Sequence, residues 1–425
     1  MSESEHPGGA GTPTPSRSLA IARIMVGLGQ GLTLNALYPL TFPGDKFWPA
    51  SNGLIFAPLL VTATFVPMVV ISSLGNLRPR NLTIWTVAAT ALCIGLAYYD
   101  IFRDPTNDAA LPRIVPSAAL WLALGGGIFI IHSMIAAGDA DRRFIATYSR
   151  YFDLAWKHGV QLVFAACLVG MFWGLLALTV LFRVEPIEPF LELAIPLLAV
   201  PGLTMAVAYV LHVTDAHPAI IRRVQMLALT CLSRLLHIVP LAVVAILLAL
   251  AFTGLEIPRN PTGILLGAAA TLVFLINTTY PDMRSATSAF TALRYSSIVA
   301  TAILVLLVAL AAYGLTLRVE QYGWSPRRIM AAACIAVGAC FAPGYLLAMA
   351  WPKARLRTFE TTNIVTAFIM LGAILALLTP IADPARIPLP TRSRDLSPAG
   401  LRPNASISVF CDLTVGVSAW KPSSA

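Results

Sequence analysis

The sequence predicts an all-α integral membrane protein, a polytopic transmembrane helical bundle of about 11 spans with a cytoplasmic amphipathic interfacial helix after the fourth. Of its 425 residues 57% are apolar and only 12% are charged, whereas a typical soluble domain is about 25% charged. The apolar residues form continuous runs of about 20, the length that a helix needs to cross the hydrocarbon core. Membrane β-barrels have short strands of alternating polarity instead, so the pattern favours helices.

The N-terminal residues 1–18 are predicted to form a disordered segment, because they are acidic and then rich in Gly, Pro, Ser and Thr. The first apolar run, residues 19–40, has the full length of a span. A cleavable signal peptide has a basic start, a shorter apolar region and a small-residue cleavage site. We therefore expect a retained first transmembrane helix.

The remaining spans are predicted from apolar runs that short polar connections separate. In chain order, the eleven spans are residues 19–40, 53–74, 82–99, 115–137, 158–182, 190–212, 235–255, 262–280, 295–317, 329–350 and 361–382. The connection after the fourth span has a helical period of its own. The predicted organisation is a four-span bundle over residues 19–137, an interfacial helix over 138–157 and a seven-span bundle over 158–382.

Residues 138–157 are predicted to form an amphipathic helix in the head-group region. Aromatic and aliphatic residues, including Tyr148 and Trp156, recur there at helical spacing and give one apolar stripe. Arg142 and Arg143 lie beside that stripe, a pattern typical of helices in the membrane interface. These four residues are the candidate interfacial docking surface for lipid or a partner. The alternative is a structural linker between the two bundles.

The basic residues predict the orientation in the membrane. The net charge of +9 comes from 29 Lys and Arg against 20 Asp and Glu. Outside the spans, fifteen Lys and Arg lie in connections on the side of the N-terminus and eight in connections on the opposite side. Positive residues gather in cytoplasmic loops, so we expect a bacterial inner membrane protein with a cytoplasmic N-terminus. The expected partners are the lipid bilayer and anionic lipid head groups on the cytoplasmic side, not nucleic acid, and the sequence identifies no protein partner.

Charged residues are rare inside the predicted spans, where only Arg23 and Glu192 occur. Both lie close to a span end, and we expect the Arg23 side chain to extend to the cytoplasmic interface. Ion-coupled transporters usually carry an acidic group or a histidine near the midplane. The lack of such a group at mid-depth argues against an ion-coupled pump.

Gln30 and Asn35 in the first span form the candidate polar intramembrane site. Gln30 lies between Gly29 and Gly31, and small residues let helices approach closely while an amide bonds across the contact. The pattern fits either helix packing or a solute site, and the sequence leaves both interpretations open.

No motif predicts catalysis, a cofactor or a metal centre. The six cysteines form no Cys-x-x-Cys pair, the spacing typical of thiolate zinc sites, and no HExxH, GxSxG or phosphate-binding loop is present. His212, His217 and Asp215 form one small cluster at a predicted cytoplasmic helix end, which fits either a metal site or an ordinary interfacial turn. We therefore expect a protein that is not an enzyme and that holds no metal and no cofactor.

Several stretches of the chain resemble a known family. They are residues 151–156 (YFDLAW), 170–173 (GMFW), 252–256 (FTGLE), 277–282 (NTTYPD), 313–316 (YGLT) and 321–326 (QYGWSP), with further likeness at 28–32 and 48–50. Together they resemble a bacterial multi-pass membrane family, domain of unknown function 4153, over about residues 20–387. The resemblance implies a polytopic membrane protein. The family assigns no activity, so the resemblance implies no catalytic residues.

Residues 383–425 are predicted to form a disordered tail rich in Pro, Ser and Arg. The composition changes abruptly near Ile387, where the resemblance ends. Two explanations stay open, a native extracytoplasmic tail and a reading-frame change near Ile387.

Two function classes follow from these features. The first is transport or permeation of a small or lipid-like solute, which would use the proline-interrupted spans and Gln30. The second is a non-catalytic membrane scaffold or sensor, which would use the predicted interfacial helix. A cavity reaching Gln30 would favour the first class, and a solid bundle with an exposed apolar flank would favour the second.

Overall fold

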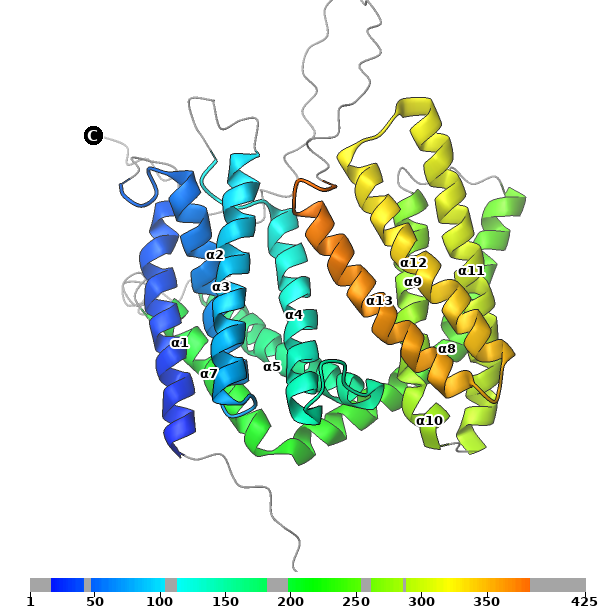
Figure 1. Cartoon of the computed structure of the whole chain (residues 1–425), viewed down its shortest axis with the longest axis horizontal. Coiled ribbons are helices and arrows are strands. Elements are labelled where there is room, and N and C mark those ends of the chain that lie inside the picture. Colours follow the sequence, from blue (N-terminus) through cyan, green and yellow to red (C-terminus); the bar gives the residue numbers. More distant parts are fainter. Residues whose placement is uncertain are drawn as a thin grey trace, which may run out of the picture. The chain divides into compact units, whose positions relative to one another are not determined.

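The computed structural model describes residues 17–41, 47–103, 113–181, 198–253, 261–285 and 288–382. The chain divides into two compact units, residues 1–387 and 388–425, and the described residues all belong to the first. All regular structure in this part of the chain is helical (Figure 1). The prediction of an all-α protein is therefore confirmed.

Twelve α-helices lie within the described residues. They are α1 (Arg17–Leu37), α2 (Gly53–Ser73), α3 (Pro79–Phe102), α4 (Ala118–Asp141), α5 (Tyr148–Leu181), α7 (Val200–Ala216), α8 (Pro218–Thr253), α9 (Pro261–Thr278), α10 (Tyr280–Ser285), α11 (Ser288–Tyr322), α12 (Pro326–Ala350) and α13 (Arg355–Leu377). A short 3-10 turn, η1 (Tyr38–Thr41), follows α1.

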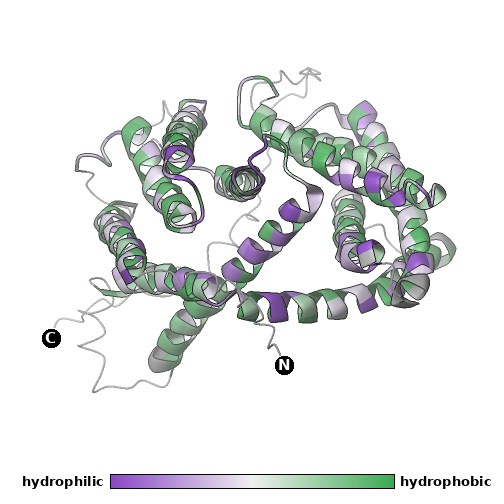
Figure 2. Ribbon diagram, turned by 60° about the horizontal axis from the view of Figure 1, so that its bottom comes forward, coloured by the Kyte–Doolittle hydropathy of each residue, from purple (hydrophilic) through white to green (hydrophobic). Residues whose placement is uncertain are grey.

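Ten of the described helices are long and apolar enough to cross a membrane: α1, α2, α3, α4, α5, α8, α9, α11, α12 and α13. Their ribbons are mostly hydrophobic in Figure 2, and large apolar side chains such as Leu122 and Ile246 are exposed. Apolar surface on this scale requires an apolar surrounding. The protein is thus a multi-pass integral membrane protein.

The sixth predicted span corresponds to α7, whose 17 residues give a length of about 26 Å at about 1.5 Å per residue. The first part of that prediction, residues 190–197, lies outside the described residues. Asp215, near the C-terminal end of α7, contacts Arg23 near the start of α1 and Asn76 just after α2. α7 therefore returns the chain to the end of the bundle where α1 begins.

Local sequence signals determine where several helices begin. The Asn52 side chain caps α2 by accepting from the Leu54 N–H at 3.0 Å. The Ser117 hydroxyl caps α4 by accepting from the Leu120 N–H at 3.2 Å. Such caps satisfy backbone donors that have no partner within the first helical turn. Proline at the start of α3 and α12 has no N–H that needs a partner there.

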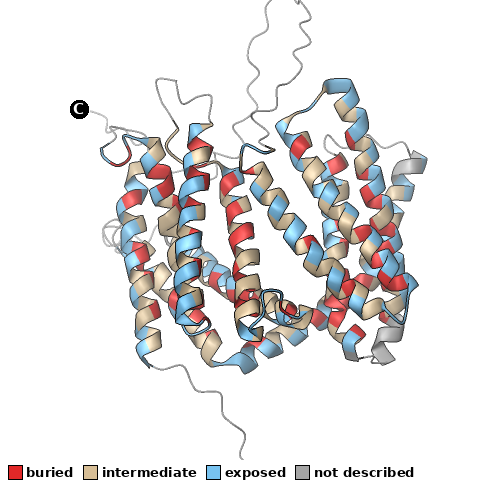
Figure 3. Cartoon of the chain, viewed as in Figure 1, coloured by how far each residue is buried: buried red, intermediate tan, exposed pale blue. Residues whose placement is uncertain are grey.

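The described helices pack as two groups with separate apolar cores. α1, α2, α3, α4 and α7 form one connected set, in which α7 lies along α1. α8, α9, α11 and α12 form the other, with Leu272, Leu304 and Tyr345 fully buried in its core. α5 and α13 contact both sets, and Figure 1 shows α13 running obliquely between α4 and α12. Figure 3 shows buried residues recurring along the helices between exposed ones.

The structure shows no separate interfacial helix over residues 138–157, all of which it describes. α4 continues to Asp141, a short connection follows, and α5 begins at Tyr148 and continues for 34 residues. The apolar stripe exists, but Phe152 is buried and Tyr148 and Trp156 pack against the core of the second helix group. Periodicity shows that one face of a helix is apolar. It does not show whether protein or lipid covers that face.

Candidate functional site

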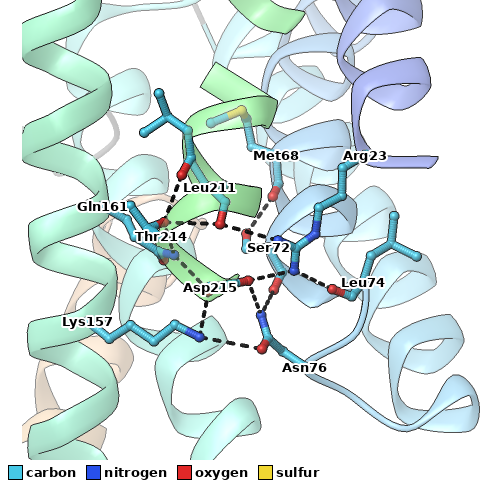
Figure 4. A network of polar contacts seen from close by, with 11 residues as sticks. Arg23, Met68, Ser72, Leu74, Asn76, Lys157, Gln161, Leu211, Thr214 and Asp215 are labelled. Carbon is cyan, nitrogen blue, oxygen red and sulfur yellow. Dashed lines mark hydrogen bonds and ion pairs between the residues drawn. The ribbon is translucent and has the colours of Figure 1, made fainter. Parts of the chain in front are cut away.

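A buried ion pair joins α1 to α7 at the end of the bundle where α1 begins (Figure 4). The Asp215 carboxylate accepts from the Arg23 guanidinium at 2.6 Å, and these side chains are only 9% and 1% exposed. The same carboxylate accepts from Lys157 Nζ at 2.8 Å, Gln161 Nε2 at 2.9 Å and Asn76 Nδ2 at 3.0 Å. One carboxylate thus connects α1, α5, α7 and the segment that follows α2.

Protein groups enclose the Arg23 side chain almost completely, and its extension to the membrane interface stays a prediction. α7 packs on this part of α1 and encloses the guanidinium, which donates to the Leu211 carbonyl at 3.3 Å and to the Leu74 carbonyl as well as to Asp215. Leu74 follows the last residue of α2, where carbonyls lack partners within the helix. The sequence indicated the depth of Arg23 along its helix but not the neighbour that buries it.

The predicted cluster of His212, His217 and Asp215 has a different organisation from a metal site. Asp215 is engaged by Arg23 and Lys157, and His217 is exposed just after α7. Among the described residues, no group of three or more His, Cys, Asp or Glu side chains is placed to hold a metal ion. The ion pairs with the two basic residues account for the position of the carboxylate.

Gln30 is buried where α1 packs against α2 and α7. Its Nε2 donates to the Thr64 carbonyl of α2 at 2.8 Å, while its Oε1 is buried without a hydrogen-bond partner among the described residues. A Cβ on the neighbouring Gly31 would lie 2.3 Å from Pro201 Cα of α7. This close approach supports the helix-packing interpretation. Asn35 is partly exposed and lies five residues further on, where the helical twist turns it about 140° from Gln30, so the two side chains do not form one site.

The four residues of the predicted docking surface lie in two different places. Arg142 and Arg143 are exposed in the connection between α4 and α5. Tyr148 and Trp156 instead line a cavity within the second helix group. The four therefore do not form one surface.

A chain of hydrogen bonds links Tyr148 to three residues on α9, α12 and α13. The Tyr148 hydroxyl donates to Asn277 Oδ1 at 2.8 Å, and Asn277 Nδ2 donates to the Tyr345 hydroxyl at 2.7 Å. The Tyr345 hydroxyl in turn donates to Asn363 Oδ1 at 2.8 Å. The second amide hydrogen of Asn277 is donated to the Val273 carbonyl of the same helix, and the Asn363 amide donates one hydrogen to the Phe359 carbonyl. Most donors of this hydrogen-bonded chain thus already have a protein acceptor.

Aromatic rings surround this chain on the side where α5 begins. The Phe359 ring stacks on the Tyr345 ring at 5.0 Å, and the Tyr148 ring meets the Tyr280 ring edge-on at 4.8 Å. The Tyr280 hydroxyl donates to the Glu360 carboxylate at 2.8 Å. Burial and this hydrogen bond raise the pKa of Tyr280 above its ordinary value. The phenol accordingly stays protonated and keeps its donor role at physiological pH.

A cavity of about 860 Å³ extends from this polar chain between α5, α9, α12 and α13. Its wall on α13 follows one helical stripe: Asn363, Ala367, Met370, Ala373, Ile374 and Leu377. The stripe from Asn363 to Leu377 is about 21 Å long at about 1.5 Å per residue, most of the thickness of a hydrocarbon core of about 30 Å. Among the described residues the lining contains no Asp, Glu, Lys, Arg or His, and its polar groups are on Tyr148, Tyr151, Trp156, Asn277, Asn363 and Cys334. Gln30 does not line this cavity.

No family model, curated protein or solved structure matches the chain. The class of protein is therefore defined by the structure, as a multi-pass helical integral membrane protein. The resemblance to domain of unknown function 4153 has no support from a family match.

Sequence reasoning missed Asn277, Tyr345 and Asn363 as parts of one constellation. Each lies within an otherwise apolar helix, and an uncharged amide in such a helix is a signal for a hydrogen-bonded partner on another helix. That signal is present in the sequence. The partner itself is not, because Asn277 and Tyr345 are 68 residues apart.

Proposed function

We propose that the protein binds a lipid-like solute in the cavity between α5, α9, α12 and α13 and moves it within or across the bilayer. The observation that carries this proposal is the cavity itself, about 860 Å³ in volume, long, and lined by apolar residues. Small-molecule sites are usually apolar clefts of about 300–1,000 Å³ with a few polar groups.

The lining favours a hydrocarbon chain over an ion or a small polar solute. Transferring a charge into such surroundings without a paired group costs several kcal/mol or more, and no charged side chain in the described part of the protein lines the wall. Both amide hydrogens of Asn277 and one of Asn363 already bind protein acceptors. A polar solute would therefore lose its hydration with few donors to replace it, whereas an acyl or isoprenoid chain would gain by burial.

The proposal includes the membrane in which the protein lies and its orientation in that membrane. The excess of Lys and Arg on the side of the N-terminus supports a cytoplasmic N-terminus in a bacterial inner membrane. The residues that resemble domain of unknown function 4153 support kinship with that family. The proposed activity is binding and movement of lipid without covalent chemistry.

The test places a large side chain in the cavity. The same change on the outer surface of the same helix is its control. Ala333 of α12 lines the cavity, whereas Ala336, three residues further on, is exposed and lies outside it. The full chain and the variants Ala333→Phe and Ala336→Phe are reconstituted in vesicles with a fluorescent phospholipid, and dithionite reduction measures lipid movement. Lipids that copurify with each protein are identified by mass spectrometry.

Ala333→Phe is expected to lower both the copurified lipid and the rate of movement by about tenfold, a change of about 1.4 kcal/mol. Ala336→Phe is expected to leave both at the level of the unchanged protein. If the Ala333→Phe variant moved lipid as fast as the Ala336→Phe variant, that result would overturn the proposal. That outcome would favour the scaffold or sensor class.

A further inference from the structure

A second cavity, of about 660 Å³, lies between α3, α4 and α13 at the end of the bundle where α1 begins. Its wall is apolar and comes from three helices, through Ile84, Ala88, Ile131, Ile135, Phe368 and Leu371. Its rim is polar and carries Arg78, Arg142, Arg143 and Asp139. The cavity is thus amphipathic, unlike the uncharged cavity of the second helix group.

The rim has an excess of positive charge that the described residues do not neutralise. Arg78 is paired with Asp139 at 2.7 Å, and the Asn81 amide also donates to that carboxylate. Arg142 and Arg143 form no hydrogen bond or ion pair through their side chains with any described residue. Two guanidinium groups at the mouth of an apolar cavity are therefore available to an anion.

The backbone after α4 holds these two arginines at the cavity. Arg142 has φ 53°, in the left-handed region, and ends α4. The Arg142 and Arg143 N–H groups donate to the carbonyls of Asp139 at 3.4 Å and Gly138 at 3.0 Å. A Cβ on Gly138 would lie 2.8 Å from the Arg143 carbonyl oxygen, so the turn requires glycine there. Next in the chain, Phe144 is 92% exposed, as expected for an aromatic ring in the membrane interface.

We propose that this cavity binds an anionic phospholipid of the surrounding bilayer. The phosphodiester is bound by Arg142 and Arg143, because guanidinium groups match phosphate oxygens in geometry and charge. One acyl chain lies along the wall that α4 and α13 share. The charge of the rim selects an anionic lipid over a zwitterionic one, and the apolar wall selects a lipid over a soluble phosphate. This site is separate from the cavity of the proposed function and does not depend on it.

The test compares two pairs of adjacent arginines at the same end of the bundle. The double variant Arg142→Asn, Arg143→Gln removes both rim charges, and asparagine tolerates the left-handed conformation at position 142. The control, Arg222→Gln with Arg223→Gln, removes two adjacent exposed arginines near the start of α8. Native mass spectrometry of the full chain in detergent measures binding of phosphatidylglycerol and of phosphatidylcholine with identical acyl chains.

The unchanged protein and the control are expected to bind phosphatidylglycerol about tenfold more tightly than phosphatidylcholine. The rim double variant is expected to lose that preference. Ala88→Phe, which fills the wall without changing charge, is expected to weaken binding of both lipids. Equal binding of the two lipids by the unchanged protein would overturn the proposal. So would an equal loss of the preference for phosphatidylglycerol in the rim double variant and in the control double variant. Competition by glycerol phosphate as effective as that by the whole lipid would also overturn it.

Discussion

Arg23 of α1 and Asp215 of α7 form a 2.6 Å ion pair across 192 residues of sequence, with the arginine almost fully enclosed. Because Lys157 also bonds the carboxylate, loss of the aspartate would leave two basic groups without their partner. Removing one member of a buried pair typically costs about 3–5 kcal/mol. Asp215→Asn is therefore expected to lower the thermal unfolding midpoint of the purified protein strongly.

A double-mutant cycle separates this pair from a general loss of packing. Arg23→Met is expected to be destabilising alone, and Arg23→Met with Asp215→Asn is expected to cost less than the sum of the two single changes, because the two groups interact directly. Arg80→Gln removes an exposed arginine at the same end and is expected to change stability by no more than about 0.5 kcal/mol. If the changes in the free energy of unfolding of the two single variants summed to that of the double variant, that result would contradict the ion pair.

Gly31→Ala is expected to disrupt the contact between α1 and α7. A Cβ at Gly31 would lie 2.3 Å from Pro201 Cα, so the backbones would have to move apart. At Gly29, two residues earlier, a Cβ meets no atom within 4 Å. Gly29→Ala is expected to be neutral or to stabilise by up to about 1 kcal/mol through helix propensity. Thermal unfolding in detergent measures both, and equal effects of the two changes would rule out the close contact.

Gln30→Leu is expected to leave lipid movement unchanged and to alter stability by about 1 kcal/mol or less. The change removes one hydrogen bond to Thr64 but also removes an amide oxygen that is buried without a partner, and the two effects oppose each other. The vesicle assay and thermal unfolding of one preparation provide both readouts. A large loss of lipid movement with unchanged stability would assign Gln30 to a solute site instead.

Tyr345→Phe is expected to destabilise the protein by about 1–3 kcal/mol. The Tyr345 hydroxyl is the only group shown to bridge Asn277 and Asn363 within the described residues, and its side chain is fully buried. Its loss leaves the two partly buried amides of Asn277 and Asn363 each short of a partner. Tyr313→Phe, at an exposed position in α11, is the matched control. An effect of Tyr345→Phe no larger than that of Tyr313→Phe would show that the chain contributes nothing to stability.

Much of the fold could be predicted because a transmembrane helix is a local property of the sequence. An apolar run of about 20 residues has to satisfy its backbone internally in lipid, and a helix does this without any partner. Ten candidate spans overlap predicted ones for this reason, although α5 and α8 begin well before the predicted starts at residues 158 and 235. The region where α4 ends and α5 begins was predicted less well. The stripe that contains Tyr148 and Phe152 has the same period whether protein or lipid covers it.

The candidate site depended on contacts between residues distant in the chain. Gln30 stood out in the sequence as an amide between glycines, yet its environment is a helix contact beside Pro201. Asn277 and Asn363 each indicated a hydrogen-bonded partner without identifying it, and they form one constellation because Tyr345 lies between them. Composition and hydropathy thus established a multi-pass helical membrane protein, since both act residue by residue along the chain. Packing decided that Arg23 is buried against Asp215 and where the two cavities lie, because burial and hydrogen-bond partners are set by helices far apart in sequence.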